Sequence, residues 1–110
     1  MTLDELVKSK NTDVEILRQR YERMWKDLVA EIHEFAKEVK LQIVATEFGL
    51  EVEILRMAAK RWTICGRYLR LSWNEAGIQM RTEAMPIGKR YTSLDLLRED
   101  IATWYSGNEG

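Results

Sequence analysis

The fold is decided by a central stretch, residues 62–84, which reads WTICGRYLRLSWNEAGIQMRTEA. On both sides of residues 74–77, apolar and polar side chains alternate with the two-residue period of a half-buried strand. The intervening loop, NEAG, ends in Gly77, and glycine supplies the positive φ that hairpin loops often need. The stretch therefore predicts an antiparallel hairpin, with residues 62–73 and 78–84 as its strands and with a bulge or break at Gly66.

Two segments before this hairpin also have strand character. Residues 41–46 are rich in β-branched side chains and fit either a strand or the end of a helix, whereas residues 50–54 alternate as LEVEI. A helical alternative is open for the second segment, because one helical face would hold Phe48, Val52, Leu55, Ala59 and Trp62. Gly49 disfavours that helix by roughly 1 kcal/mol. We prefer the strand, which gives a sheet of three to four strands.

Helices are predicted at both ends of the chain by a hydroxyl residue three positions before an acid, the pattern of a capping box. The three pairs are Thr2 with Glu5, Thr12 with Glu15, and Thr92 with Asp95. We expect a short helix over about residues 2–9 that breaks at Asn11, a long helix over about 12–39, and a final helix over about 93–105. The apolar residues of the long helix recur every three or four positions and form one stripe.

The order helix, helix, three or four strands, helix predicts an α+β fold. Each helix has one apolar stripe to bury, so an antiparallel meander with the helices packed on one face is the expected architecture. The 110 residues match the usual size of a single domain. We assign residues 1–110 to that domain, residues 1–11 to an N-terminal arm or short helix, and residues 106–110 to a frayed tail.

The predicted long helix is longer than the body it should cover. Its 28 residues would span roughly 42 Å, whereas a compact domain of this size is roughly 35 Å across. The overhang could be covered by the first helix folding back, by a second copy packing as a coiled coil, or by a different protein. We therefore predict a partner-binding surface, and a possible homodimer interface, at Val14, Leu17, Tyr21 and Trp25.

The charges are unevenly distributed although the formal net charge is −1. Residues 56–92 hold 8 basic and 2 acidic side chains, and the flanking segments are acidic. We predict that Arg67, Arg70 and Arg81 bind a protein partner with acidic groups. The alternative is a single-stranded nucleic acid held by the basic, aromatic strands over residues 60–82. The slightly acidic chain weakens long-range attraction to nucleic acid, so we favour the protein partner.

Candidate catalytic residues are few, and each has a structural explanation. His33 fits a surface position on the long helix, Cys65 fits a small buried apolar residue, and Glu51 with Glu53 fits the solvated face of a sheet. No zinc, calcium, phosphate-loop or hydrolase motif is present. We therefore expect no enzyme activity, no metal and no cofactor.

The chain contains one cysteine, no apolar run long enough to span a bilayer and no signal-peptide pattern at its start. These features favour a cytoplasmic protein without a membrane partner. The expected function is that of a small non-enzymatic protein-binding module, similar in size and charge to inhibitors, immunity proteins, adaptors and chaperones.

Overall fold

The computed structural model describes residues 1–47 and 49–107. Its elements are α1 (Leu3–Phe35), β1 (Leu41–Ala45), β2 (Leu50–Ala58), β3 (Arg61–Asn74), β4 (Gly77–Thr82), β5 (Lys89–Tyr91) and α2 (Leu94–Ser106). The five strands form one antiparallel sheet in the order β1-β2-β3-β4-β5. The predicted α+β class and meander are confirmed, but the sheet has five strands rather than three or four.

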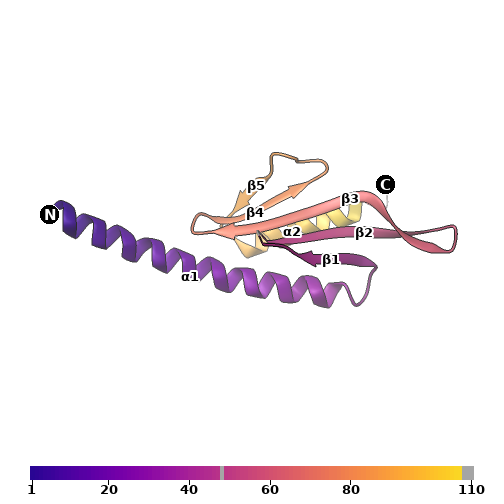
Figure 1. The fold of residues 1–110 in the computed structure, drawn as a ribbon, viewed down its shortest axis with the longest axis horizontal. Coiled ribbons are helices and arrows are strands. Elements are labelled where there is room, and N and C mark those ends of the chain that lie inside the picture. The colour runs from indigo at the N-terminus through magenta and orange to yellow at the C-terminus, as the bar shows by residue number, and fades with distance from the viewer. Residues whose placement is uncertain (48, 108–110) are drawn as a thin grey trace.

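The molecule is elongated, with extents of 68 × 24 × 24 Å. Figure 1 shows why: the first half of α1 extends past one end of the sheet, and the β2–β3 hairpin extends past the other end. The second half of α1 and all of α2 pack on the same face of the sheet, where they build one core. The core residues are Leu28, Ile32, Leu50, Val52, Ile54, Leu69, Leu71, Ile78, Met80, Tyr91, Leu97 and Trp104.

The N-terminal region forms one continuous helix, so the predicted break at Asn11 is wrong. Thr2 caps α1 as predicted, since its hydroxyl accepts a hydrogen bond from the Glu5 backbone N–H. Thr12 is not a cap: its hydroxyl donates to the Lys8 carbonyl one turn earlier, a bond that lies within a helix. The helix ends at Phe35, four residues before the predicted Val39.

The described residues of 41–60 contain strands rather than helix, as the alternation at residues 50–54 predicted. Phe48, which the helical alternative placed on its apolar face, lies outside the described residues. β1 pairs with β2 from Leu41 opposite Ile54 to Ala45 opposite Leu50. The predicted loop after the central strand is also confirmed, because Asn74 pairs with Gly77 across the β3–β4 turn and Gly77 has a φ of +132°.

The predicted bulge or break at Gly66 is confirmed as an irregularity in the strand pairing, where residues 65–67 of β3 stand against Ile54 of β2. The register of β2 and β3 shifts between Glu53 and Leu55, and Gly66 has a φ of +85°, which side-chain-bearing residues rarely adopt. Extra residues in one strand bend and twist that strand. The irregularity lies where the β2–β3 hairpin leaves the body of the sheet (Figure 1).

Two details at the C-terminal end differ from the prediction. β5 was missed, and the cap of α2 is Ser93 rather than Thr92, without a side-chain capping bond. The predicted tail at residues 106–110 overlaps the end of α2 at Ser106 and its C-cap Gly107. The rest of that predicted tail, residues 108–110, lies outside the described residues.

Candidate binding surfaces

The first candidate surface is the projecting segment, which we define as residues 3–20 of α1. Every residue in it is exposed, since the sheet lies alongside only the later turns of the helix (Figure 1). One side of the segment carries an apolar seam of Leu3, Leu6, Val7, Val14 and Leu17. At 100° per residue the seam continues the stripe that reaches the core at Tyr21, Leu28 and Ile32. The apolar face of α1 is thus buried over its second half only.

The four helix residues predicted to bind a partner divide between the projecting segment and the body. Val14 and Leu17 are 39% and 37% exposed, as a binding surface requires. Tyr21 is only 4% exposed, and Trp25 packs partly buried against the core. Of these four residues, only Val14 and Leu17 therefore present exposed apolar surface on the projecting segment.

Arg67 is one of the predicted basic residues, but it points into the fold rather than outward. Its Nε donates to Glu83 Oε1 over 2.8 Å, and its Nη2 donates to the Trp104 carbonyl. Glu83 Oε2 also accepts from the Tyr68 backbone N–H and from Trp104 Nε1, each over 3.1 Å. Arg67 and Glu83 thus connect β3 to α2. The Arg67 guanidinium is already hydrogen-bonded within the molecule and does not point toward a partner.

This cluster determines the ionisation of Glu83. Burial alone would raise the pKa of the Glu83 carboxyl, but hydrogen bonds from its own backbone N–H, Trp104, Arg67 and Tyr68 outweigh burial and lower it. Glu83 therefore remains a carboxylate beside the Arg67 guanidinium, and the pair joins the sheet to the C-terminal helix.

Arg70 and Arg81 lie on the opposite face of the sheet, which neither helix covers. They are direct neighbours across β3 and β4, and both are exposed. The Arg70 guanidinium lies 4.7 Å from the centre of the Tyr68 ring and 3.6 Å from Glu51 Oε1. Two of the three predicted arginines are therefore brought together on an open surface, next to an aromatic ring and one carboxylate.

The second candidate surface, which the sequence reading missed, is the β-arm, defined as residues 55–64. β1 pairs with β2 only as far as Ile54, and β4 pairs with β3 only from Leu69. Within the described chain the arm is thus a two-stranded ribbon that extends beyond the body (Figure 1).

The β-arm has one apolar face and one basic face. Leu55 pairs with Ile64, and Met57 pairs with Trp62, so these four side chains share one face. All but Leu55 are about half-exposed. The other face carries Arg56, Ala58, Arg61 and Thr63.

The turn at the tip of the β-arm is strained. Ala59 and Lys60 have φ values of +51° and +66°. Two consecutive positive φ angles are typical of a type I′ turn, which favours Asn-Gly. A residue with a Cβ costs about 1 kcal/mol at such a position. The Ala59–Lys60 turn therefore lowers the stability of the fold, and it places the Lys60 ammonium group at the tip of the β-arm.

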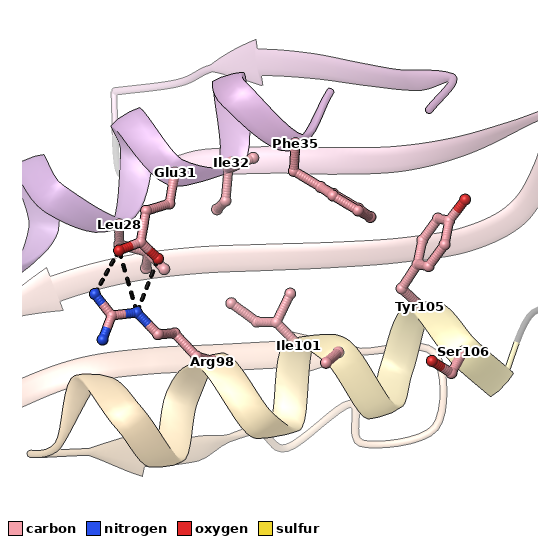
Figure 2. Close-up of a pocket in the computed structure, with 9 residues that line it drawn as sticks. Leu28, Glu31, Ile32, Phe35, Arg98, Ile101, Tyr105 and Ser106 are labelled. Carbon is pink, nitrogen blue, oxygen red and sulfur yellow. Dashed lines mark hydrogen bonds and ion pairs between the residues drawn. The ribbon is translucent and has the colours of Figure 1, made fainter. Parts of the chain in front are cut away.

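A groove of about 370 Å³ lies between α1 and α2 on the helical face of the molecule. In Figure 2, Ile32 and Phe35 of α1 point toward Ile101 and Tyr105 of α2. The Phe35 and Tyr105 rings meet edge to face, with centroids 5.0 Å apart.

The other end of the groove is closed by an ion pair between Arg98 and Glu31 (Figure 2). The hydrogen bond from Arg98 lowers the pKa of Glu31, and Arg98 also contacts Asp95 over 2.8 Å. The Arg98–Glu31 pair joins the two helices, whereas the Arg98–Asp95 contact lies within α2.

The residues considered for catalysis are not brought together. His33 is exposed on α1, and Cys65 lies partly buried at the edge of the core. Glu51 and Glu53 share the face of the sheet opposite the helices, but both are only half-exposed. Glu53 Oε2 is buried without a hydrogen-bond partner in the part of the chain that the structure describes, so this carboxylate is not solvated as predicted. Among the described residues, no group of three or more His, Cys, Asp or Glu side chains could hold a metal ion. No helix in the same part of the chain is both long and apolar enough to cross a membrane.

No protein-family model, curated protein or solved structure matches the chain.

Proposed function

We propose that the chain is a non-enzymatic protein-binding module that packs the apolar seam of its projecting segment against a helix of its partner. The observation that carries this proposal is the exposure of the whole segment. Large apolar patches on soluble proteins are usually interaction sites. Inhibitors, immunity proteins, adaptors and chaperones would all use such a surface, and the single cysteine is compatible with a cytoplasmic location.

Helix energetics support a binding role for the segment. Isolated helices of this length are marginal in water, because most helical stability comes from packing of an apolar face. The projecting segment has an apolar face but lies beyond its own sheet (Figure 1). Covering the five seam side chains, already partly shielded, would contribute about 1 kcal/mol each. A helical partner would thus stabilise the segment while burying its seam.

A matched pair of variants tests the proposal. Leu17→Asp places a carboxylate in the seam, whereas Ile16→Asp places one on the far side of the same helix. Ile16 is 59% exposed and lies about 180° from Val7 around the axis. We expect Leu17→Asp to abolish association with the partner and Ile16→Asp to leave it intact.

The partner is sought by affinity capture from the native host, and each captured protein is purified and titrated against the chain. A second copy of the chain counts as a partner in this test. If no protein, the chain itself included, binds in a manner sensitive to Leu17→Asp but not to Ile16→Asp, the proposal is wrong.

The second candidate function is binding of single-stranded nucleic acid. One observation favours it: residues 54–73 contain five basic side chains and no acidic one. Three of the basic residues lie on the β-arm, and Arg70 lies beside Tyr68 on the open face. Tyr68 is half-buried, and basic groups next to an accessible ring are typical of sites that hold phosphates and stacked bases.

Retention of a labelled single-stranded DNA or RNA should then fall steeply with salt. Arg70→Ala should weaken binding, whereas Arg18→Ala on the projecting segment should not. Binding that is insensitive to salt, or equally affected by both changes, would exclude this function.

A further inference from the structure

We infer that the partner of the projecting segment is a second copy of the chain, with the two segments packed side by side and antiparallel. This inference rests on the proposed function, because it names the partner of the same seam. It is carried by the residue spacing along the segment, by the position of the sheet beside α1 and by the length of the overhang.

The seam has the seven-residue period of a coiled coil. Val7, Val14 and Tyr21 form one row along α1, and Leu3, Lys10 and Leu17 form the second. These rows correspond to the a and d positions of heptads. Four of these six side chains (Leu3, Val7, Val14 and Leu17) belong to the exposed seam, Lys10 is charged, and the buried Tyr21 marks the point where the stripe enters the body. The segment can therefore form a two-helix seam only as far as Tyr21.

The position of the sheet excludes a parallel pair. The stripe that forms the seam in the projecting segment faces the chain's own sheet from Tyr21 onward. In a parallel pair, the second halves of both helices would run alongside each other on that same face. The partner's helix and sheet would then occupy the space already filled by this chain's sheet (Figure 1). An antiparallel partner avoids this clash, because its helix begins where this chain's body begins.

The length of the overhang fits the antiparallel arrangement. The 18 residues of the projecting segment span roughly 27 Å, so two segments can overlap completely. In the symmetric register, Val7 faces Leu17 of the second copy, and Leu3 lies level with its buried Tyr21, where the body of that copy begins. Each N-terminus then reaches the body of the other copy.

That end of the body offers a hollow of about 460 Å³ next to the helix. Its apolar lining includes Trp25, Val29, Leu50 and Trp73. Met1 and Leu3 are among the most exposed apolar residues of the molecule, at 85% and 77%. The hollow is placed to receive these side chains from the second copy.

The charges along the seam agree with this direction. In a parallel pair Lys10 would face Lys10 inside the seam, which places two like charges together. In the antiparallel register Lys10 faces Val14, and Asp4 lies near Arg18 of the second copy. The same register brings the two exposed Asp13 side chains near each other at the two-fold axis, at a cost of at most about 1 kcal/mol. A parallel pair would bring Asp13 near Arg18, but an exposed ion pair is worth at most about 1 kcal/mol.

The first test is the mass of the chain in solution. Sedimentation equilibrium should give twice the 13.0 kDa of one chain at micromolar concentration. Leu17→Asp should raise the dimer dissociation constant roughly 100-fold or more, because two carboxylates enter the seam of each dimer. Ile16→Asp should leave the constant within about threefold of the unmodified chain.

The second test determines direction by disulfide trapping in a Cys65→Ala background. Val7→Cys and Leu17→Cys are made in separate chains and oxidised alone and mixed. The antiparallel register predicts crosslinks in the mixture and none in either variant alone. Crosslinks within each variant alone would indicate a parallel pair and overturn the inference.

The two proposals fail in different ways. A chain that stays monomeric up to about 1 mM with no crosslinks overturns self-association. If a different protein then binds in a manner sensitive to Leu17→Asp but not to Ile16→Asp, the protein-binding function still holds. If no such protein exists either, both proposals are wrong.

Discussion

Replacing Glu83 by glutamine should lower the free energy of unfolding by about 2–3 kcal/mol. The carboxylate accepts from Arg67, Tyr68 and Trp104 at 2.8–3.1 Å. Glutamine keeps one acceptor but presents an NH₂ group to a second donor, and it leaves the Arg67 guanidinium without its carboxylate. A hydrogen bond to a charged group contributes about 1.5–3 kcal/mol. The Arg67 and Glu83 side chains are 20% and 29% exposed, so solvent screening places the expected loss at 2–3 kcal/mol rather than higher.

Thermal unfolding followed by circular dichroism measures this loss. For a domain of about 100 residues, the expected change corresponds to a melting temperature roughly 8–15 °C lower. Glu75→Gln serves as the control, because Glu75 is exposed in the β3–β4 turn. That change should alter stability by at most about 0.5 kcal/mol. Equal, small effects of the two substitutions would refute the assignment of Glu83 as the link between the sheet and α2.

Three further predictions concern pH, the β-arm and the sheet. Hydrogen bonds outweigh burial and lower the pKa of the Glu83 carboxyl below its usual 4.5. The stabilisation of the fold by ionised Glu83 is therefore complete above pH 4.5 and is lost as the pH falls through the lowered pKa. The urea midpoint of the unmodified chain should thus exceed that of Glu83→Gln by the largest amount at neutral pH, and this difference should shrink below about pH 4. A difference that does not change with pH would contradict this prediction. Ala59→Asn combined with Lys60→Gly should raise the melting temperature, with a gain of about 1–2 kcal/mol, because both residues have positive φ; an unchanged melting temperature would mean that the turn is not strained. Gly49→Ala should reduce stability in urea titrations by more than about 2 kcal/mol, because its Cβ would lie 1.9 Å from the Leu71 carbonyl oxygen; a loss below about 0.5 kcal/mol would show that the close approach is absent.

The parts of the fold that were predictable depend on local periodicity. The alternation at residues 50–54 and the glycine of the 74–77 loop predicted β2 and the β3–β4 hairpin, because both signals act within a few residues. β5 was missed because its three residues are too short to show a period. The break predicted at Asn11 failed because a single residue of modest helix propensity costs less than 1 kcal/mol within a long helix.

The candidate surfaces were only partly predictable, because burial depends on where other elements end. The overhang of α1 could be inferred from its length, but the sequence could not show that the body begins at Tyr21. The basic segment suggested Arg67 as a partner-binding residue, but its actual partner, Glu83, lies sixteen residues further along the chain. The β-arm could not be predicted for the same reason: residues 56–64 are exposed only because β1 and β4 end before they reach the arm.

The overhang of α1 also divides the molecule into regions of unequal local stability. In a lone chain, the backbone amides of the projecting segment are protected only by hydrogen bonds between successive helical turns, which open without any disruption of the core. Those amides should exchange with deuterated solvent within seconds, and trypsin should cut first at Lys8, Lys10, Arg18 or Arg20, leaving the sheet and α2 intact. A molecule that covers the seam should therefore slow amide exchange and delay tryptic cleavage at the N-terminus, whether it is a second copy of the chain or a different protein.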